Sequence, residues 1–294
     1  MTTSTLGGLL PALVTPLRED RTLNTPVFEK LLEHVYSAGC HGVYLCGSTG
    51  EGLLLPMRMR RDIVEIAARN TPAGRNIVVH AGSLSLEDAT QLARHAEASG
   101  AAAISSIRPY GTTFAEMMET YRCLGQATSL PFLAYYFPNE VGGPLDASQL
   151  EQVCALPGVV GVKFTDYDLY TLALLARQGK LIFHGRDEML AAGFLMGACG
   201  GIGSIYNFVP EWFVALYDHA RAGRWNEARE AQDRINDLIR VLLSFPFLSA
   251  LKRALTWRGF ECGIPLAPRL PLTGMQERDL IEALEALPGL RRGW

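Results

Sequence analysis

The chain alternates eight short, almost continuously apolar runs with longer amphipathic segments, and this alternation limits the possible folds more than any other feature of its 294 residues. Apolar runs of this length are typical of strands buried on both faces, as in a parallel sheet. Eight repeats of roughly 25 to 35 residues favour right-handed strand–helix crossovers that close into a barrel. The runs cover residues 9–14, 42–45, 77–81, 102–107, 132–136, 159–163, 181–184 and 200–205.

The segments between the runs carry helix signals. Residues 27–38 place four large apolar side chains on one face. Ser85 and Asp146 are good N-cap residues for helices at 85–99 and 146–155. The pattern therefore predicts an α/β fold, a (β/α)₈ TIM barrel. An open doubly wound sheet is the alternative, but no GxGxxG motif follows the first run.

Beyond Pro210 the strand pattern ends, and only helical segments are expected. They cover residues 211–222, 225–243, 248–257 and 276–286. No low-complexity stretch or linker divides the chain. We interpret residues 1–210 as the barrel and residues 211–294 as a helical C-terminal extension of the same domain.

Charge and cysteine usage narrow the class of protein. The net charge is −3 and the sequence pI is about 6.1, so neither nucleic acid nor an anionic membrane is an expected partner. The apolar runs are too short to span a bilayer, and residues 1–8 lack the charged start of a signal peptide. The six cysteines show no CxxC or zinc spacing and are expected to be free thiols. A soluble, cytoplasmic protein is predicted.

In a barrel of this kind, the active site lies at the carboxyl ends of the strands. Polar residues follow each apolar run of this chain. They are Thr15, the segment Cys46–Glu51, His80, Arg108–Tyr110, Tyr135 and Tyr136, Lys163 with Thr165, His184–Glu188, and Ser204–Asn207.

Lys163 directly follows the apolar residues Val159–Val162. A lysine in this position can keep its ammonium group in water or pair with an acid. It can also lie in a dry barrel mouth, where apolar surroundings lower the pKa of the amine. A neutral amine attacks a ketone and forms an iminium, which is an electron sink. Taken alone, Lys163 is compatible with either role.

Two neighbouring strand ends fit a reaction on a 2-oxo acid. Tyr135 can relay a proton or simply pack in the core. The segment Gly47–Gly50 allows close backbone approach and offers hydroxyl and N–H donors to a carboxylate, although it also suits an ordinary turn. None of these features is specific alone, but together with Lys163 they occupy the ends of three strands.

Four ordered motifs carry a family resemblance that runs from about Leu9 to Pro271. The chain resembles the class I aldolases and lyases that include dihydrodipicolinate synthase and N-acetylneuraminate lyase. The motifs are Ala12–Pro16, Gly47–Glu51, Tyr135–Pro138 and Gly161–Thr165.

The resemblance implies a role for each matching residue. Lys163 would form the Schiff base to a 2-oxo acid such as pyruvate, and Tyr135 would relay the proton. Ser48 and Thr49 would hold the carboxylate of the substrate. Because the lysine imine is the electron sink, no metal or other cofactor is expected. The family also implies a homotetramer.

Within the family, the N-acetylneuraminate lyase branch is more similar. The lysine segment through Thr165 resembles that branch, as does the segment from Gly185, whose acidic pair Asp187 and Glu188 would bind a glycerol-like tail. Ser204 would bind the same tail. Carboxylates accept hydrogen bonds from vicinal hydroxyls, although acids at this position are also favourable at the start of a helix.

Two departures from the family pattern affect the expected substrate. Glu140 stands where the synthase branch has a substrate-binding arginine, which disfavours dihydrodipicolinate synthesis. After the fourth run, Arg108 and Pro109 precede Tyr110. Tyr110 is shifted from the position of the family tyrosine that reaches a neighbouring subunit, and we include it as a candidate for that catalytic role.

Three alternatives remain at this point. In the first, the chain is an aldolase or dehydratase for another 2-keto-3-deoxy acid. In the second, it binds a 2-oxo acid without catalysis. In the third, it is a metal-dependent barrel enzyme. The last would use His80 and His184 with nearby carboxylates as zinc or manganese ligands. The two histidines are isolated in the sequence and do not form an HxH or HExxH motif.

Overall fold

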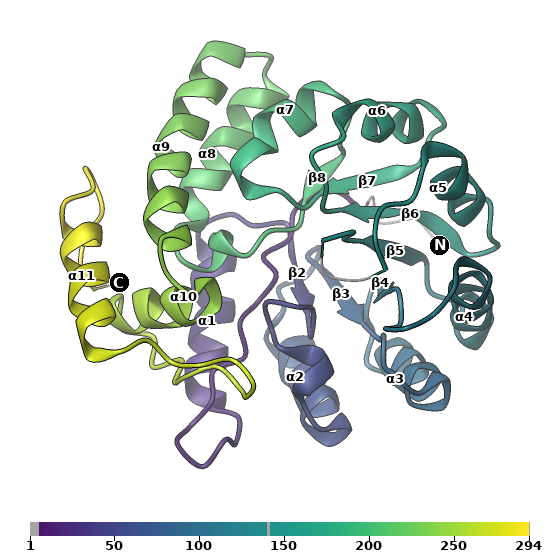
Figure 1. Cartoon of the computed structure of the whole chain (residues 1–294), viewed down its shortest axis with the longest axis horizontal. Coiled ribbons are helices and arrows are strands. Elements are labelled where there is room, and N and C mark those ends of the chain that lie inside the picture. The colour runs from purple at the N-terminus through teal and green to yellow at the C-terminus, as the bar shows by residue number, and fades with distance from the viewer. Residues whose placement is uncertain (1–5, 140–141, 294) are drawn as a thin grey trace.

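The computed structural model describes residues 6–139 and 142–293. Eight parallel strands stand side by side in one sheet that closes on itself, with helices around it (Figure 1). The sheet order is β1-β8-β7-β6-β5-β4-β3-β2, and a parallel bridge between Ala12 and Tyr44 joins its two edges. The predicted (β/α)₈ TIM barrel is confirmed. The strands are β1 (Gly8–Leu9), β2 (Gly42–Leu45), β3 (Asn76–His80), β4 (Ala103–Ile107), β5 (Phe132–Tyr136), β6 (Val159–Phe164), β7 (Leu181–His184) and β8 (Gly200–Gly201).

A helix follows each strand, and three more helices follow the last of these. The helices are α1 (Thr25–Ser37), α2 (Met57–Asn70), α3 (Leu86–Ala98), α4 (Phe114–Ala127), α5 (Ala147–Cys154), α6 (Leu169–Arg177), α7 (Leu190–Leu195), α8 (Pro210–Arg221), α9 (Trp225–Leu243), α10 (Phe247–Trp257) and α11 (Gly274–Glu285). Short 3₁₀ turns η1 (Gly52–Leu54), η2 (Asp187–Met189) and η3 (Ile205–Asn207) follow strands β2, β7 and β8.

The expected helix caps are present. The Ser85 side chain accepts a hydrogen bond from the Asp88 N–H at the start of α3. Asp146 forms a full capping box with Gln149 at the start of α5. These bonds satisfy N–H groups that the first turn of a helix leaves free. They explain why the sequence placed both helix starts correctly.

The first and last strands are shorter than the predicted runs 9–14 and 200–205. Pro11 has no N–H and interrupts the regular ladder of β1, although its carbonyl still accepts from Tyr44 N–H at 2.8 Å. After β8 the chain turns into η3. Continuous apolar composition therefore predicted which segments form strands. It did not predict where the hydrogen-bonded ladder ends in β1 and β8.

Alternation along the strands separates two packing layers. One set of side chains fills the barrel interior, while the other packs between the sheet and the helices. The interior set includes Leu10, Tyr44, Val78, Leu133 and Phe183. A barrel of eight strands is just wide enough to be filled in this way.

The helices α9 to α11 gather at one side of the barrel, beyond α1 and α8 (Figure 1). Their apolar faces form a cluster with Leu31 of α1 and with residues of the first strand segment. The proposed boundary between residues 210 and 211 falls within the first turn of α8. The division into a barrel and a helical extension remains our interpretation.

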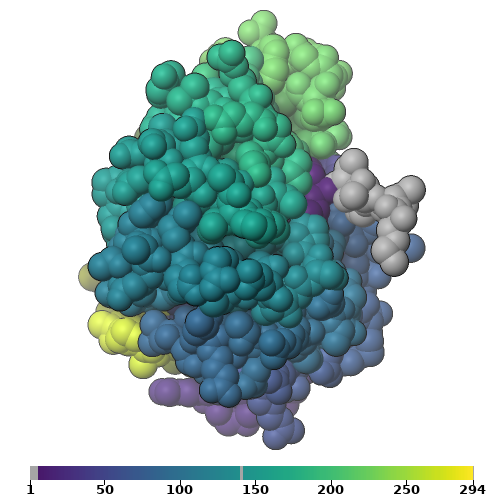
Figure 2. Space-filling view, turned by 90° about the vertical axis from the view of Figure 1, so that its right-hand side faces the viewer, coloured from purple at the N-terminus to yellow at the C-terminus, as the bar shows by residue number. Residues whose placement is uncertain are grey.

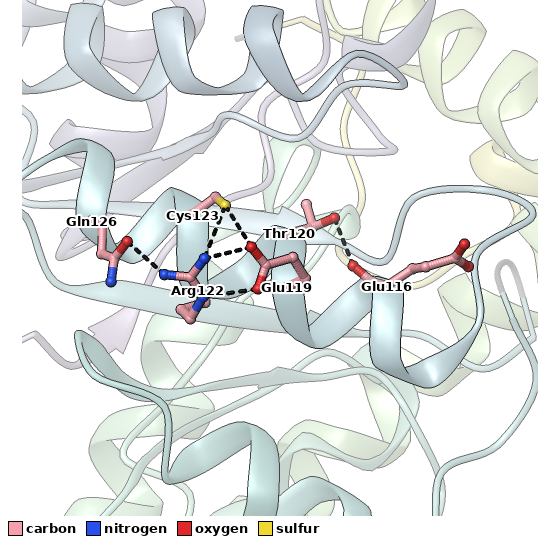
Figure 3. Close-up of polar contacts among 6 residues, drawn as sticks. All are labelled: Glu116, Glu119, Thr120, Arg122, Cys123 and Gln126. Atoms are coloured by element: carbon pink, nitrogen blue, oxygen red, sulfur yellow. Dashed lines mark hydrogen bonds and ion pairs between the residues drawn. The ribbon is translucent and has the colours of Figure 1, made fainter.

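Segments from the middle of the chain cover most of the face shown in Figure 2. On α4, Arg122 forms an ion pair with Glu119 and donates to Gln126 at 2.8 Å (Figure 3). Because these groups are substantially exposed, such pairs contribute little to stability. Cys123 lies in the same polar row and is partly exposed, unlike Cys154 of α5, which is buried. No helix within the described ranges has both the length and the apolar character of a membrane span.

Candidate active site

A cavity of about 680 Å³ opens at the carboxyl ends of the strands. Its walls come from the loops after β2, β5, β6, β7 and β8 and, on one side, from α9 and α10. The cavity brings together all the predicted site residues except Tyr110. They are Ser48, Thr49, Tyr135, Lys163, Thr165, Gly185, Asp187, Glu188 and Ser204.

Lys163 and Tyr135 are direct partners in the register of β5 and β6. Residues paired in this way point to the same face of the sheet, here the barrel interior. Both side chains are buried, and the Lys163 Nζ lies 3.9 Å from the centre of the Tyr135 ring. It lies 4.3 Å from the centre of the Tyr44 ring. The amine is therefore held between two aromatic faces at the bottom of the cavity.

The loop after β2 brings hydroxyl groups beside this amine. Ser48 Oγ lies 3.5 Å from the Tyr135 hydroxyl, and Thr49 Oγ1 lies 2.6 Å from Ser204 Oγ. A Cβ at Gly47 would come within 2.5 Å of the Tyr44 ring, so only glycine allows the loop this close to the barrel interior. We refer to Ser48 and Thr49 with their backbone N–H groups as the carboxylate cradle.

The acidic pair lies at the other end of the cavity, where Asp187 is buried. One oxygen of its carboxyl group accepts from the Ile205 N–H at 2.9 Å. The backbone carbonyl of Asp187 accepts from Gln232 Nε2 at 2.9 Å, which anchors η2 to α9. Burial raises the pKa of this carboxyl group from its ordinary value to about 7.

Glu188 is already engaged by neighbouring side chains. The Tyr167 hydroxyl donates to Glu188 Oε1 at 2.6 Å, and Arg186 Nη1 lies 4.0 Å from the same oxygen. The Arg186 guanidinium lies 4.2 Å from the centre of the Tyr167 ring and 5.3 Å from that of Phe137. These four side chains line the cavity and come from the loops after three consecutive strands.

The two histidines of the metal alternative lie on opposite sides of the sheet wall. His80 is next to the Tyr135 ring and accepts from the Ile107 N–H at 3.0 Å. His184 packs against Gly193 of α7, where a Cβ would lie 2.7 Å from its ring. Burial lowers the pKa of both imidazoles, that of His184 to about 4. No three His, Cys, Asp or Glu side chains within residues 6–139 and 142–293 are grouped to hold a metal ion. The metal alternative therefore gains no support.

Comparison with known proteins shows the family of this chain. A family model described as the dihydrodipicolinate synthetase family matches residues 5–287. The chain belongs to this family.

Several of the similar proteins are N-acetylneuraminate lyases. An N-acetylneuraminate lyase of Rhizobium meliloti (strain 1021) is 35% identical over 286 residues, covering 96% of this chain and 94% of that protein. The crystal structure of CdNal from Clostridium difficile in complex with mannosamine has a TM-score of 0.91 at 26% identity, covering 96% of this chain and 99% of that one. The Proteus mirabilis N-acetylneuraminate lyase has a TM-score of 0.88 at 29% identity, covering 96% and 99%. The predicted family and its lyase branch are confirmed.

Two predictions made from the family pattern, those for Tyr110 and Glu140, stay predictions. Tyr110 lies in the turn after β4, about half exposed, and does not line the cavity of its own chain as described. Its role at a neighbouring subunit stays a prediction. Glu140, which replaces the arginine of the synthase branch, lies outside the described residues.

Several residues in or near the cavity were given no role by the family pattern or the strand-end argument. Tyr44 lies within β2, two residues before its loop, and its hydroxyl donates to Ser105 Oγ at 3.1 Å. Tyr167 lies between the matched positions and gave no signal of its own, whereas Arg186 falls within the strand-end segment His184–Glu188 but was assigned no role. The contribution of α10 to the cavity was also missed. Lys252 and Arg253 are adjacent charges on that helix, and the sequence alone does not show that Lys252 is the buried one.

Proposed function

We propose that the protein is a class I carbon–carbon lyase that cleaves N-acetylneuraminate or a closely related 2-keto-3-deoxy sugar acid to pyruvate and an aldehyde. The observation that carries the proposal is the buried Lys163 amine, 3.9 Å from the ring of Tyr135, at the bottom of a cavity of about 680 Å³. The lyases of Rhizobium meliloti and Proteus mirabilis, which are similar over nearly the whole chain, support the same activity.

The reaction follows from the positions of the groups. The carboxylate of the open-chain substrate binds to Ser48 and Thr49, and the Lys163 amine attacks C2, with loss of water, to form an iminium. The Tyr135 hydroxyl relays the proton from the C4 hydroxyl as the C3–C4 bond breaks. The bonding electrons move into the iminium and leave an enamine. Protonation at C3 and hydrolysis then release pyruvate. Because the iminium accepts the electrons, the reaction requires no metal or other cofactor.

At the far end of the cavity, Asp187 and Glu188 orient the hydroxyl groups of the tail. Ser204, whose Oγ lies 2.6 Å from Thr49 Oγ1, binds the part of the tail nearest the carboxylate cradle. Thr165 and Gly185 line the wall between the two ends. Buried polar groups reject substrates that leave them unpaired. The enclosed position of this acidic pair supports a polyol tail rather than a small aldehyde.

A second substrate class is favoured by one observation. Glu188 Oε1 already accepts from Tyr167 and lies near Arg186, so fewer acceptor positions remain for hydroxyl groups than two free carboxylates would offer. This arrangement favours a 2-keto-3-deoxy acid with a different tail. Relative kcat/KM values over a panel of such acids, including N-acetylneuraminate, decide between the two classes.

The assembly and the location are further parts of the proposal. We propose a homotetramer, which the family membership supports, with Tyr110 directed at a neighbouring subunit. We propose a cytoplasmic location because the widely spaced cysteines suit a reducing compartment. Light scattering at several protein concentrations tests the tetramer, and fractionation of the source cells tests the location.

Borohydride trapping tests the central claim. Wild type incubated with pyruvate and borohydride is expected to gain the mass of a reduced pyruvyl adduct, and peptide mapping is expected to place it on Lys163. Lys163→Ala is expected to give no adduct. Lys180→Ala is the matched control, because the Lys180 Nζ donates to Val159 O at the opposite end of β6. A folded wild type that yields no adduct rules the proposal out.

A further inference from the structure

Glu51 ends the loop that carries the carboxylate cradle, and its side chain turns inward. Its backbone has a φ of 58°, in the left-handed region that non-glycine residues adopt infrequently. The next residue, Gly52, leaves no room for a side chain, because a Cβ there would lie 1.7 Å from Cys46 O. The loop is thus folded tightly on itself, and the Glu51 carboxylate is buried, with 0% of its side chain exposed.

Lys252 of α10 meets this carboxylate from a point 201 residues further along the chain. The Lys252 Nζ lies 2.5 Å from Glu51 Oε1, and it also donates to Ile264 O at 3.3 Å. The other oxygen of Glu51 accepts from the Leu266 N–H at 2.6 Å. Both charged groups are therefore buried with several hydrogen-bond partners, and apart from Glu51 itself these come from α10 and from the segment between α10 and α11.

A buried ion pair is weak evidence for stability, because the cost of removing two charges from water offsets their attraction. Its geometry, however, is strongly fixed, since either charge alone would be left unpaired in the interior. The other contacts of the loop are with the barrel itself. Thr15 Oγ1 donates to Gly50 O at 2.6 Å, and Thr49 bonds to Ser204. The ion pair, together with the bond from the Leu266 N–H, joins the loop to the C-terminal part of the chain.

The same helix that holds Lys252 also shapes the cavity. Phe247, Leu248 and Ser249, at the first turn of α10, line the cavity opposite the strand ends. The Glu51–Lys252 pair therefore ties the cradle and the α10 wall to each other. A shift of the pair moves the two surfaces between which the substrate binds.

We propose that Glu51 and Lys252 are positioning residues that hold the carboxylate cradle in its binding geometry. They do not touch the substrate, and they act through the backbone of Ser48–Gly50. This inference rests on the proposed function, because it assigns the cradle to the carboxylate of a 2-oxo acid. It makes the C-terminal helices part of the pyruvate-binding apparatus.

The test measures pyruvate binding separately from imine chemistry. Borohydride trapping is followed against pyruvate concentration for wild type, Lys252→Met and Lys252→Arg. Arg253→Met is the matched control, because Arg253 is the next residue on α10 and pairs with Glu277 at 3.0 Å where both side chains are partly exposed. Circular dichroism and gel filtration establish that each variant is folded.

Lys252→Met is expected to raise the half-saturating pyruvate concentration by about tenfold or more, the effect of losing one charge-assisted contact. The amount of adduct at saturation is expected to stay within about twofold of wild type, because Lys163 and Tyr135 are in place. Lys252→Arg keeps the charge and is expected to restore most of the affinity. Arg253→Met is expected to match wild type.

Other outcomes would contradict the inference or the proposed function on which it rests. If folded Lys252→Met has the same half-saturating pyruvate concentration as wild type, the Glu51–Lys252 pair does not position the cradle. If the single variant does not fold, the double variant Glu51→Gln/Lys252→Met leaves no lone buried charge and decides by the same measurement. If wild type itself forms no adduct, the proposed function fails and the inference falls with it.

Discussion

The two ends of the cavity are built from different parts of the fold. At the pyruvate end, Lys163 and Tyr135 are register partners on neighbouring strands, and both are buried. At the tail end, Asp187 and Glu188 lie in the 3₁₀ turn after β7, and Tyr167 lies in the loop after β6. Strands in a closed barrel are rigid, whereas loops tolerate change. The reacting atoms are therefore held by the scaffold, and the aldehyde part of the substrate is selected by the loops.

Polar groups at both ends of the cavity already have internal partners. At the pyruvate end, Ser48 Oγ lies 3.5 Å from the Tyr135 hydroxyl and Thr49 Oγ1 lies 2.6 Å from Ser204 Oγ. At the tail end, internal partners already engage Glu188 and one oxygen of Asp187. Substitutions at the pyruvate end should alter the rate of the chemistry. Those at the tail end should alter the apparent affinity for the aldehyde part and leave pyruvate trapping unchanged. Four measurements test this separation.

The largest effect is expected for Tyr135→Phe. Loss of the relay hydroxyl is expected to lower kcat for N-acetylneuraminate cleavage by about 10²- to 10⁴-fold, the usual contribution of a positioned acid–base group. Borohydride trapping of pyruvate should persist, because Lys163 is unchanged. Tyr136→Phe is the control, since Tyr136 is on the outer face of β5 and its hydroxyl accepts from the Leu145 N–H at 3.1 Å. Similar losses in both variants would contradict the assignment of Tyr135.

Glu188→Gln is expected to act only at the tail end. Loss of a carboxylate acceptor should raise KM for N-acetylneuraminate by about tenfold, as expected for one charge-assisted hydrogen bond. The half-saturating pyruvate concentration in the trapping assay is the internal control and should match wild type. An equal change in both quantities would show that the two ends are not separable.

Asp187 should make the tail end sensitive to pH near neutrality. Its carboxyl pKa is raised to about 7 by burial, so the folded protein keeps a proton that the unfolded chain loses near pH 4. This contribution to stability is complete below about pH 4 and is lost as the pH rises through 7. It amounts to a few kcal/mol in order of magnitude. Urea midpoints at pH 4.5 and 8 are expected to show this slope in wild type relative to Asp187→Asn.

The same ionisation should appear in catalysis, because only the ionised carboxylate is a full acceptor for hydroxyl groups. KM for N-acetylneuraminate is expected to fall between pH 6 and 8 in wild type, and Asp187→Asn should lack that change. Asp187→Asn with the wild-type pH profile would contradict this part of the comparison.

Tyr167→Phe is expected to have the smallest effect. Without its hydroxyl group, Glu188 Oε1 becomes available to the substrate, and KM for N-acetylneuraminate should fall by about two- to fivefold, a fraction of one hydrogen bond. Stability should change by less than about 1 kcal/mol, because the residue is half exposed. Tyr170→Phe, a more exposed tyrosine at the start of α6, is the control. A rise in KM would mean that Tyr167 aligns Glu188 rather than competing for it.

Much of the fold was predictable because its signals are local. The runs at 42–45, 132–136 and 181–184 coincide with β2, β5 and β7, and the helix at 225–243 coincides with α9. Burial on both faces makes such strands apolar throughout, and an amphipathic helix repeats every 3.6 residues. The extent of β1 and β8 was not predictable, because apolar content does not report where a proline or a turn ends the ladder.

The candidate site was predictable where it depends on position along the chain. In a parallel barrel every strand end faces the same mouth, so residues such as Ser48, Lys163 and Ser204 converge by topology alone. The same rule overpredicted His184, whose side chain faces α7, because strand alternation has period two and the end of a strand does not specify a face.

The order of apolar and polar residues was enough to determine the barrel class, the strand ends and the residues that meet there, because each depends on short-range periodicity and on a topology that repeats. Only the tertiary structure decided which groups touch. Tyr167 meets Glu188 across two loops, and Glu51 meets Lys252 across 201 residues. Such contacts depend on barrel closure and on how the C-terminal helices pack against it. No local pattern encodes that packing, because it is the sum of many weak side-chain contacts distant in sequence.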